Sequence, residues 1–161
     1  MHRKSQAKSS KKIVMVSGGF DPVHIGHVRL LQEAKKLGDE LVVVINNDNW
    51  LRFKKGFVFM PEADRKEIIE SLRFVDRVHL TEHEESTDDI SVCRELELIR
   101  PHIFANGGDR KDDNIPEYEL CQRLGIEMVF NVGNGGKVRS SSELVKEAAA
   151  RHKTFKKNAT R

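Results

Sequence analysis

The fold of this chain is decided by one stretch of sequence, Ile13-Val14-Met15-Val16-Ser17-Gly18-Gly19-Phe20-Asp21-Pro22-Val23-His24-Ile25-Gly26-His27. Its first four residues are apolar and mostly β-branched, which is typical of a strand buried on both faces. Beyond the two glycines, apolar residues recur at helical spacing and a glycine supplies a stop: Val28, Leu31, Ala34, Leu37 and Gly38. The stretch therefore predicts a strand, a tight turn and a helix, whose free N-terminal N–H groups favour a phosphate.

The turn carries two histidines that point to chemistry. His24 and His27 are three residues apart, so they project to one side of a helix that begins near His24. Gly18 and Gly19 let the backbone approach an anion without an intervening Cβ. From the residues alone, a structural role for an H-x-x-H pair is an equal alternative. Zinc binding is a weaker one, because a helical zinc pair usually has i, i+4 spacing.

Strand and helix signals alternate along the rest of the chain. Apolar runs predict four further strands, at 40–46, 77–80, 103–105 and 126–130, with helices expected over 62–74, 86–99 and 114–124. This alternation predicts an α/β fold: a Rossmann-like, doubly wound, five-stranded parallel sheet with helices on both faces. Ligands bind such sheets at the carboxyl ends of the strands.

Length and composition limit the class of protein. With 161 residues, the chain has the size of one domain, which we place at residues 13–150. No apolar run approaches the ~18 residues of a membrane span, so we expect a soluble, cytoplasmic protein without a membrane partner. Cys93 and Cys121 lack metal-binding or redox spacing and are expected to be reduced structural thiols.

Positive charge is concentrated in two tails, residues 1–12 and 151–161, which contain ten Lys and Arg and no acidic residue. Without them the body holds 18 Lys+Arg against 25 Asp+Glu, a formal charge of −7 instead of +3. Such polar, basic segments are expected to be disordered. Non-specific nucleic-acid contact through counterion release is the lesser alternative.

The segment Gly19–His27 resembles the G-x-F-D-x-x-H-x-G-H signature of the cytidylyltransferase-like nucleotidyltransferases, nearest to glycerol-3-phosphate cytidylyltransferase and the heptose-phosphate nucleotidyltransferases. The likeness covers roughly residues 13–146. It implies transfer of a nucleoside monophosphate from an NTP, with CTP favoured, to a phosphorylated sugar or polyol, and release of pyrophosphate. An ATP-dependent heptose-phosphate adenylyltransferase is the alternative, and a non-catalytic nucleotide sensor is the alternative of another class. The likeness also implies a homodimer.

The same resemblance implies three groups of site residues. His24, His27 and Lys55 would be catalytic. Asp48, Lys54, Arg65 and Arg110 would bind the acceptor, with both lysines on a basic loop at 51–56; capping is an equal alternative for Asp48. The nucleotide would be held by Gly18, Gly19, Phe20, His24, His27, Gly108, Asp109, Arg139, Ser140, Ser141 and Ser142. A capping box of Ser140 with Glu143 would by itself explain that serine.

The implied chemistry needs no general base, because a phosphate monoester with a second pKa of about 6 is already ionised at neutral pH. Positioning and charge stabilisation would then supply most of the catalysis. Mg²⁺ is expected on the nucleotide phosphates, held by substrate and water instead of a protein cage.

Overall fold

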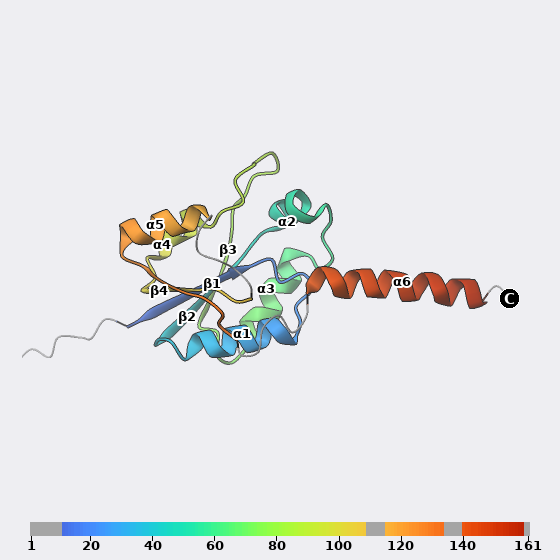
Figure 1. Ribbon diagram of the computed structural model, residues 1–161, viewed down its shortest axis with the longest axis horizontal. Coiled ribbons are helices and arrows are strands. Elements are labelled where there is room, and N and C mark those ends of the chain that lie inside the picture. The colour runs from blue at the N-terminus through green and yellow to red at the C-terminus, as the bar shows by residue number, and fades with distance from the viewer. Residues whose placement is uncertain (1–10, 109–114, 134–139, 160–161) are drawn as a thin grey trace, which may run out of the picture.

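The computed structural model describes residues 11–108, 115–133 and 140–159, and they form an α/β domain from which one long helix projects (Figure 1). The elements follow in the order β1 (Ile13–Gly18), α1 (Ile25–Lys35), β2 (Glu40–Ile45), α2 (Asp48–Lys55), α3 (Glu62–Glu70), β3 (Arg77–Leu80), α4 (Cys93–Ile99), β4 (Ile103–Ala105), α5 (Pro116–Leu124), β5 (Glu127–Val129) and α6 (Ser141–Ala159). No helix among these residues is long and apolar enough to cross a bilayer.

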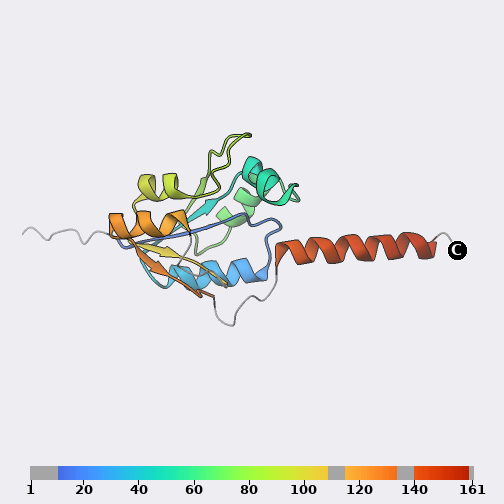
Figure 2. The same ribbon diagram turned by 45° about the horizontal axis from the view of Figure 1, so that its top comes forward.

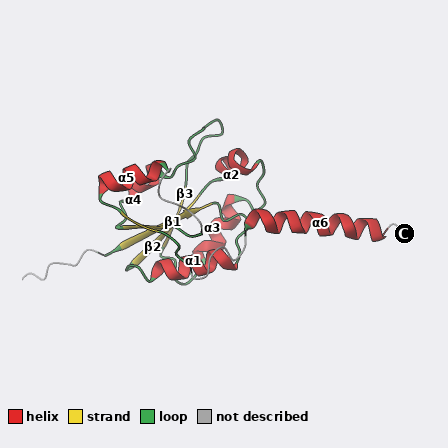
Figure 3. Cartoon of the chain, in the orientation of Figure 1, coloured by secondary structure: helices red, strands yellow, loops and turns green. Residues whose placement is uncertain are grey.

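The sheet has five parallel strands in the order β3-β2-β1-β4-β5, which confirms the predicted fold class. β1 lies at the centre, paired with β2 along its whole length and with β4 at Val14 and Met15. Figure 3 shows the strands enclosed between helices. The predicted bounds of β3 and β4 match the structure residue for residue.

Alternate residues of the strands contribute to two separate hydrophobic cores, one on each face of the sheet. Val14, Val16 and Val43 pack with Leu31 of α1 and Ile69 of α3 on one face. On the other face, the second core joins Met15, Val44 and Phe104 to residues of α4 and α5 such as Leu96, Leu120 and Cys121. All three residues of β1 in these cores, Val14, Met15 and Val16, are at most 1% exposed, as expected for a strand covered on both sides.

The strand order indicates where at the edge of the sheet a ligand is expected to bind. From β1 the chain continues to β2 on one side, whereas from β4 it continues to β5 on the other. The carboxyl ends of β1 and β4 therefore flank the point where the winding direction reverses, and this is where open α/β sheets form a ligand crevice. Gly18 ends β1 there, and Asn106 follows β4.

Two local predictions are wrong. The expected basic loop at 51–56 is the end of helix α2, which starts because the Asn47 side chain accepts a hydrogen bond from Trp50 N at 3.0 Å. The helix expected from residue 86 begins only at Cys93. Hydrogen bonds of Thr87 and Asp89 side chains to backbone N–H groups two residues ahead replace helical bonds in that segment.

The C-terminal tail also differs from the expectation, because α6 continues through Ala159 instead of ending near residue 150. Ala148, Ala149 and Ala150 are strong helix formers, and Arg151 pairs with Glu147 one turn earlier at 3.8 Å. Figures 1 and 2 both show α6 extending away from the sheet. The side chains of residues 146–153 are exposed, so up to residue 153 only the first turns of this helix pack against the domain.

Candidate active site

The two histidines form the N-terminal cap of α1. His24 is the N-cap residue, and its Nδ1 accepts a hydrogen bond from Gly26 N at 3.1 Å. His27, three residues later, accepts from His24 N with its own Nδ1 at 3.3 Å. This is a capping box in which imidazoles replace the usual hydroxyl and carboxylate. The structural alternative therefore holds for both histidines, and it is compatible with the predicted ligand-binding role.

The cap determines which nitrogen carries the proton in the neutral form of each ring. Because each Nδ1 accepts a backbone N–H, the proton of each neutral ring resides on Nε2. Burial, with the neighbouring His24 and Lys55 charges, lowers the pKa of His27 from 6.5 to about 3. At neutral pH His27 is therefore neutral and presents its Nε2–H as a donor at the positive end of a helix.

Asp21 links this turn to the segment after α2. Its carboxylate, 1% exposed, accepts from Phe59 N at 2.8 Å and Met60 N at 2.6 Å. The peptide bond between Asp21 and Pro22 is cis. Lys55 Nζ donates to the backbone oxygen of Asp21 at 3.2 Å, and burial lowers the pKa of Lys55. The predicted catalytic lysine therefore lies beside the histidine turn, as the resemblance implies.

Arg65, predicted to bind the acceptor, is a buried structural residue. It is fully buried and donates to Gly19 O, Asn46 O and Met60 O, and to Asp48 Oδ1 at 2.7 Å. These partners occupy the guanidinium, so it presents no surface to a ligand. It holds together the end of β1, the end of β2 and the start of α2, where it forms an ion pair with Asp48.

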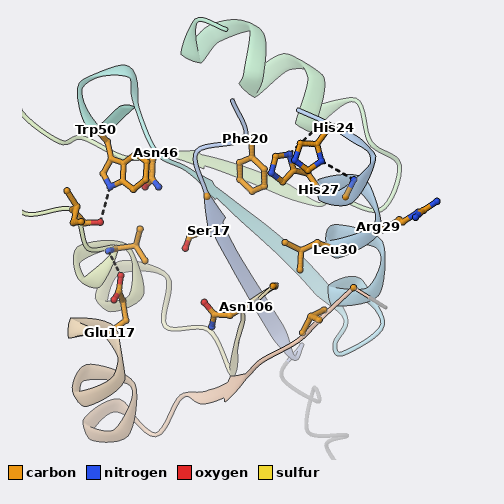
Figure 4. A pocket seen from close by; sticks show the side chains of 18 residues that line it. Ser17, Phe20, His24, His27, Arg29, Leu30, Asn46, Trp50, Asn106 and Glu117 are labelled. Carbon is orange, nitrogen blue, oxygen red and sulfur yellow. Dashed lines mark hydrogen bonds between the residues drawn. The ribbon is translucent and has the colours of Figure 1, made fainter. Parts of the chain in front are cut away.

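A cavity of about 320 Å³ opens at the reversal point between β1 and β4 (Figure 4). Five of the predicted nucleotide-binding residues line it: Gly18, Phe20, His24, His27 and Gly108. Phe20 packs edge-on against His27, with ring centroids 5.0 Å apart. This size is within the range of small-molecule sites.

Other predicted residues lie elsewhere. The predicted residues that do not line this cavity are Gly19, Asp48, Lys54, Lys55, Arg65, Ser140, Ser141 and Ser142. A Cβ on Gly19 would come 3.0 Å from Leu51 Cδ2, so that glycine serves packing. Lys54 is exposed. The Ser141 hydroxyl donates to Pro22 O at 3.0 Å, which brings the start of α6 against the turn before α1. Asp109, Arg110 and Arg139 lie outside the described residues.

The rest of the lining was not among the predicted site residues. It comes from the end of β1, from α1 and from segments near the carboxyl ends of other strands, and it consists of Ser17, Gly26, Arg29, Leu30, Asn46, Trp50, Ile90, Val92, Asn106, Gly107, Glu117, Val132 and Gly133. The position of Asn46 and Asn106 directly after β2 and β4 is the signal that could have identified them. For Ile90 and Glu117 the sequence holds no comparable signal.

Among the described residues no cluster of three or more His, Cys, Asp or Glu side chains could hold a metal ion. The cavity instead offers hydrogen-bond donors at the start of α1. This donor set suits an anionic ligand such as a polyphosphate.

Comparison with known proteins agrees with this geometry. The cytidylyltransferase-like family model matches residues 15–147. FAD synthase of Aciduliprofundum boonei is 39% identical over 115 residues, covering 71% of this chain and 73% of that protein. Bifunctional protein HldE of Desulfatibacillum aliphaticivorans is 33% identical over 125 residues, covering 76% of this chain but only 24% of that longer protein.

A solved structure shows the same fold. The crystal structure of the lipopolysaccharide core biosynthesis protein from Thermoplasma volcanium GSS1 has a TM-score of 0.60 and 32% sequence identity, and covers 74% of this chain and 95% of that one. The family match spans the central sheet, the histidine turn and the cavity. The chain therefore belongs to the cytidylyltransferase-like family and is a nucleotidyltransferase.

Proposed function

We propose that this protein transfers a nucleoside monophosphate from an NTP to a phosphorylated sugar or polyol and releases pyrophosphate. The observation that carries the proposal is the pair of Nε2–H groups at the N-terminus of α1, which line the cavity with Lys55 beside them. Three donor groups and a helix N-terminus in one place suit a substrate with several negative charges.

In the proposed reaction a phosphate oxygen of the acceptor attacks the α-phosphorus in line. One P–O bond forms, the bond to the β-phosphate oxygen breaks, and pyrophosphate takes the electron pair. The nucleophile is already ionised at neutral pH, so no side chain has to remove a proton. His24, His27 and Lys55 stabilise the charge that develops on the phosphates, a role that neutral imidazole N–H groups can perform.

Ser140, Ser141 and Ser142 belong to this proposal as a second phosphate contact. The bond from Ser141 to Pro22 O places the start of α6 next to the histidine turn. Two helix N-termini would then face the triphosphate, in keeping with the two-sided clamp that the sequence suggests. Asp109 and Arg139 remain candidates for the nucleotide, and Lys54 and Arg110 for the acceptor.

ATP is the first donor to test, ahead of the CTP that the sequence favours. FAD contains an adenylyl group, and FAD synthase is among the relatives that match most of this chain. A heptose-phosphate adenylyltransferase is the corresponding alternative, because HldE matches at a similar identity. Mg²⁺ would arrive on the nucleotide phosphates; we assign no side chain to it. A homodimer is also part of the proposal.

Pyrophosphate release tests the reaction. Each of ATP, CTP, GTP and UTP is paired with glycerol 3-phosphate, hexose and heptose phosphates and flavin mononucleotide, with Mg²⁺ present. We expect release with one nucleotide and only when an acceptor is present. Nucleotide binding with no release for any pair would instead support the sensor.

A further inference from the structure

The cavity has two chemically different ends (Figure 4). His24 and His27 lie at one end, together with Leu30, whereas Trp50 and Asn46 lie across the end of β1 from them. Glu117 lines the same side as Trp50, from the start of α5. In an in-line displacement the acceptor approaches opposite the leaving pyrophosphate. If the histidines hold the pyrophosphate, the acceptor extends toward Trp50.

Asn46 is the unusual residue at this second end. Its side chain is 4% exposed, and Oδ1 is buried without a hydrogen-bond partner among the described residues. Leaving a buried amide oxygen unpaired costs on the order of 1–3 kcal/mol, so such atoms are rare in folded proteins unless a ligand satisfies them. Because Asn46 lines the cavity, a ligand hydroxyl group that reached this buried oxygen would supply the missing donor.

Glu117 supplies a second acceptor. It is 3% exposed, and its Oε1 accepts from Val92 N at 3.1 Å. Its other carboxylate oxygen, Oε2, has no hydrogen-bond partner within the described part of the chain. Trp50, next to Asn46, is held in place because its indole N–H donates to Ile90 O at 2.9 Å. The indole ring therefore presents an apolar face to the cavity, and its N–H group is not available to a ligand.

We propose that Asn46 and Glu117 are the residues that select the acceptor, by accepting hydrogen bonds from its hydroxyl groups while Trp50 packs against its carbon skeleton. The proposal rests on the nucleotidyl transfer proposed above and narrows its acceptor to a hydroxyl-rich sugar or polyol phosphate. Flavin mononucleotide carries comparable hydroxyl groups on its ribityl chain, so its ring is what disfavours it: the ring has one N–H donor, and its two carbonyl oxygens would be repelled by a carboxylate.

Tryptophan fluorescence tests the site without requiring turnover, because Trp50 is the only tryptophan in the chain. The full-length protein, with an α,β-methylene analogue of the active nucleotide, is titrated with glycerol 3-phosphate and hexose and heptose phosphates. Flavin mononucleotide is followed by its own fluorescence. We expect saturable changes with a sugar or polyol phosphate, at a Kd at least 100-fold lower than for the flavin.

Variants assign the effect to the two residues. Asn46→Leu keeps the size of the side chain, and Glu117→Gln keeps the Oε1 acceptor for Val92 N. Each is expected to raise the Kd and KM for the acceptor about tenfold while leaving the KM of the nucleotide within twofold. Asn49→Ala is the matched control, since Asn49 donates to His83 O and does not line the cavity.

Three outcomes would overturn the proposal: flavin binding as tight as any sugar phosphate, an unchanged acceptor Kd in Asn46→Leu, or a rise in the nucleotide KM instead of the acceptor KM. The last would place the nucleoside at Trp50. A saturable fluorescence change without pyrophosphate release would reject the proposed reaction yet keep the binding site. Pyrophosphate release that does not depend on Asn46 or Glu117 would support the proposed reaction and reject the proposed acceptor site.

Discussion

The imidazole rings of His24 and His27 stack, with centroids 3.8 Å apart and planes inclined by 22°. Two positive charges at this separation would repel each other, and the pKa of His27 is accordingly lowered to about 3 by burial, His24 and Lys55. His27 is therefore a neutral donor at neutral pH, stacked on the ring of His24. This geometry also rules the pair out as a base for an acceptor hydroxyl, because each Nδ1 is already occupied by a backbone N–H.

Removing either Nε2–H while keeping the cap should slow catalysis without unfolding the protein. His24→Asn places a preferred N-cap residue at position 24, and His27→Gln supplies the usual capping-box partner at position 27. We expect each to lower kcat by about 10²–10³-fold, the effect of losing one donor to a developing anion. Pyrophosphate release gives kcat, and circular dichroism melting gives Tm. Near-normal kcat in His27→Gln would remove that residue from the mechanism.

Stability should depend on pH through His27. Its pKa is about 3 when folded and about 6.5 in an unfolded chain, so the unfolded state binds more protons between these values. The contribution of neutral His27 is complete above pH 6.5 and is lost as the pH falls toward 3. Urea unfolding at pH 7.5 and pH 5 should show a loss that is smaller in His27→Gln. An equal loss in both proteins would contradict the lowered pKa.

Arg65 should matter for folding more than for binding. Replacing it with Met removes four hydrogen bonds and leaves Asp48 and three carbonyl groups without their partner. We expect a fall of roughly 3–5 kcal/mol in the free energy of unfolding, the usual result of breaking a buried ion pair. Urea denaturation measures it, with the exposed Arg73→Met as control. A loss below 1 kcal/mol in Arg65→Met would show that the network is dispensable.

Substitutions of the two lysines of α2 should have different effects on turnover. Lys55 reaches the histidine turn, whereas Lys54 is exposed. Lys55→Met is expected to lower kcat by at least about 10²-fold, because its charge lies beside the histidine turn. Lys54→Met should leave kcat within threefold and change only the KM of the acceptor, because a solvated charge contributes little at a distance. Lys66→Met, from an exposed pair with Glu70, controls for loss of charge alone. The reverse order for the two α2 variants would assign the phosphate contact to Lys54.

The end of α6 should be dispensable for folding. Residues 146–153 are exposed, so deleting residues 152–161 should change the free energy of unfolding by less than about 0.5 kcal/mol. If the basic tails contact nucleic acid, this deletion should also weaken a steeply salt-dependent binding to DNA, measured by fluorescence anisotropy. A large loss of stability would show that the helix packs on a second copy of the chain.

The sequence could predict those structural features whose signals lie within a few neighbouring residues. β1, the start of a helix near His24 and the end of a helix at residue 124 were predicted because buried strands and helix ends have short sequence signatures. The loop predicted at 51–56 failed because Lys and Arg are common both in loops and at helix C-termini, where they are favourable. The helix expected at 86–92 failed because side chains there bond to the backbone instead.

The sequence by itself determined the alternating α/β order, the histidine turn and the reaction class, since these depend on residues within about fifteen positions of each other. Only the tertiary structure decided that Arg65 is buried, and that Asn46, Trp50 and Glu117 lie on one side of a cavity. Those facts depend on strand order, which brings residues up to 71 positions apart to one edge of the sheet. The opening stretch determined the histidine turn at one end of the cavity, and the packing of distant elements decided which residues lie opposite it.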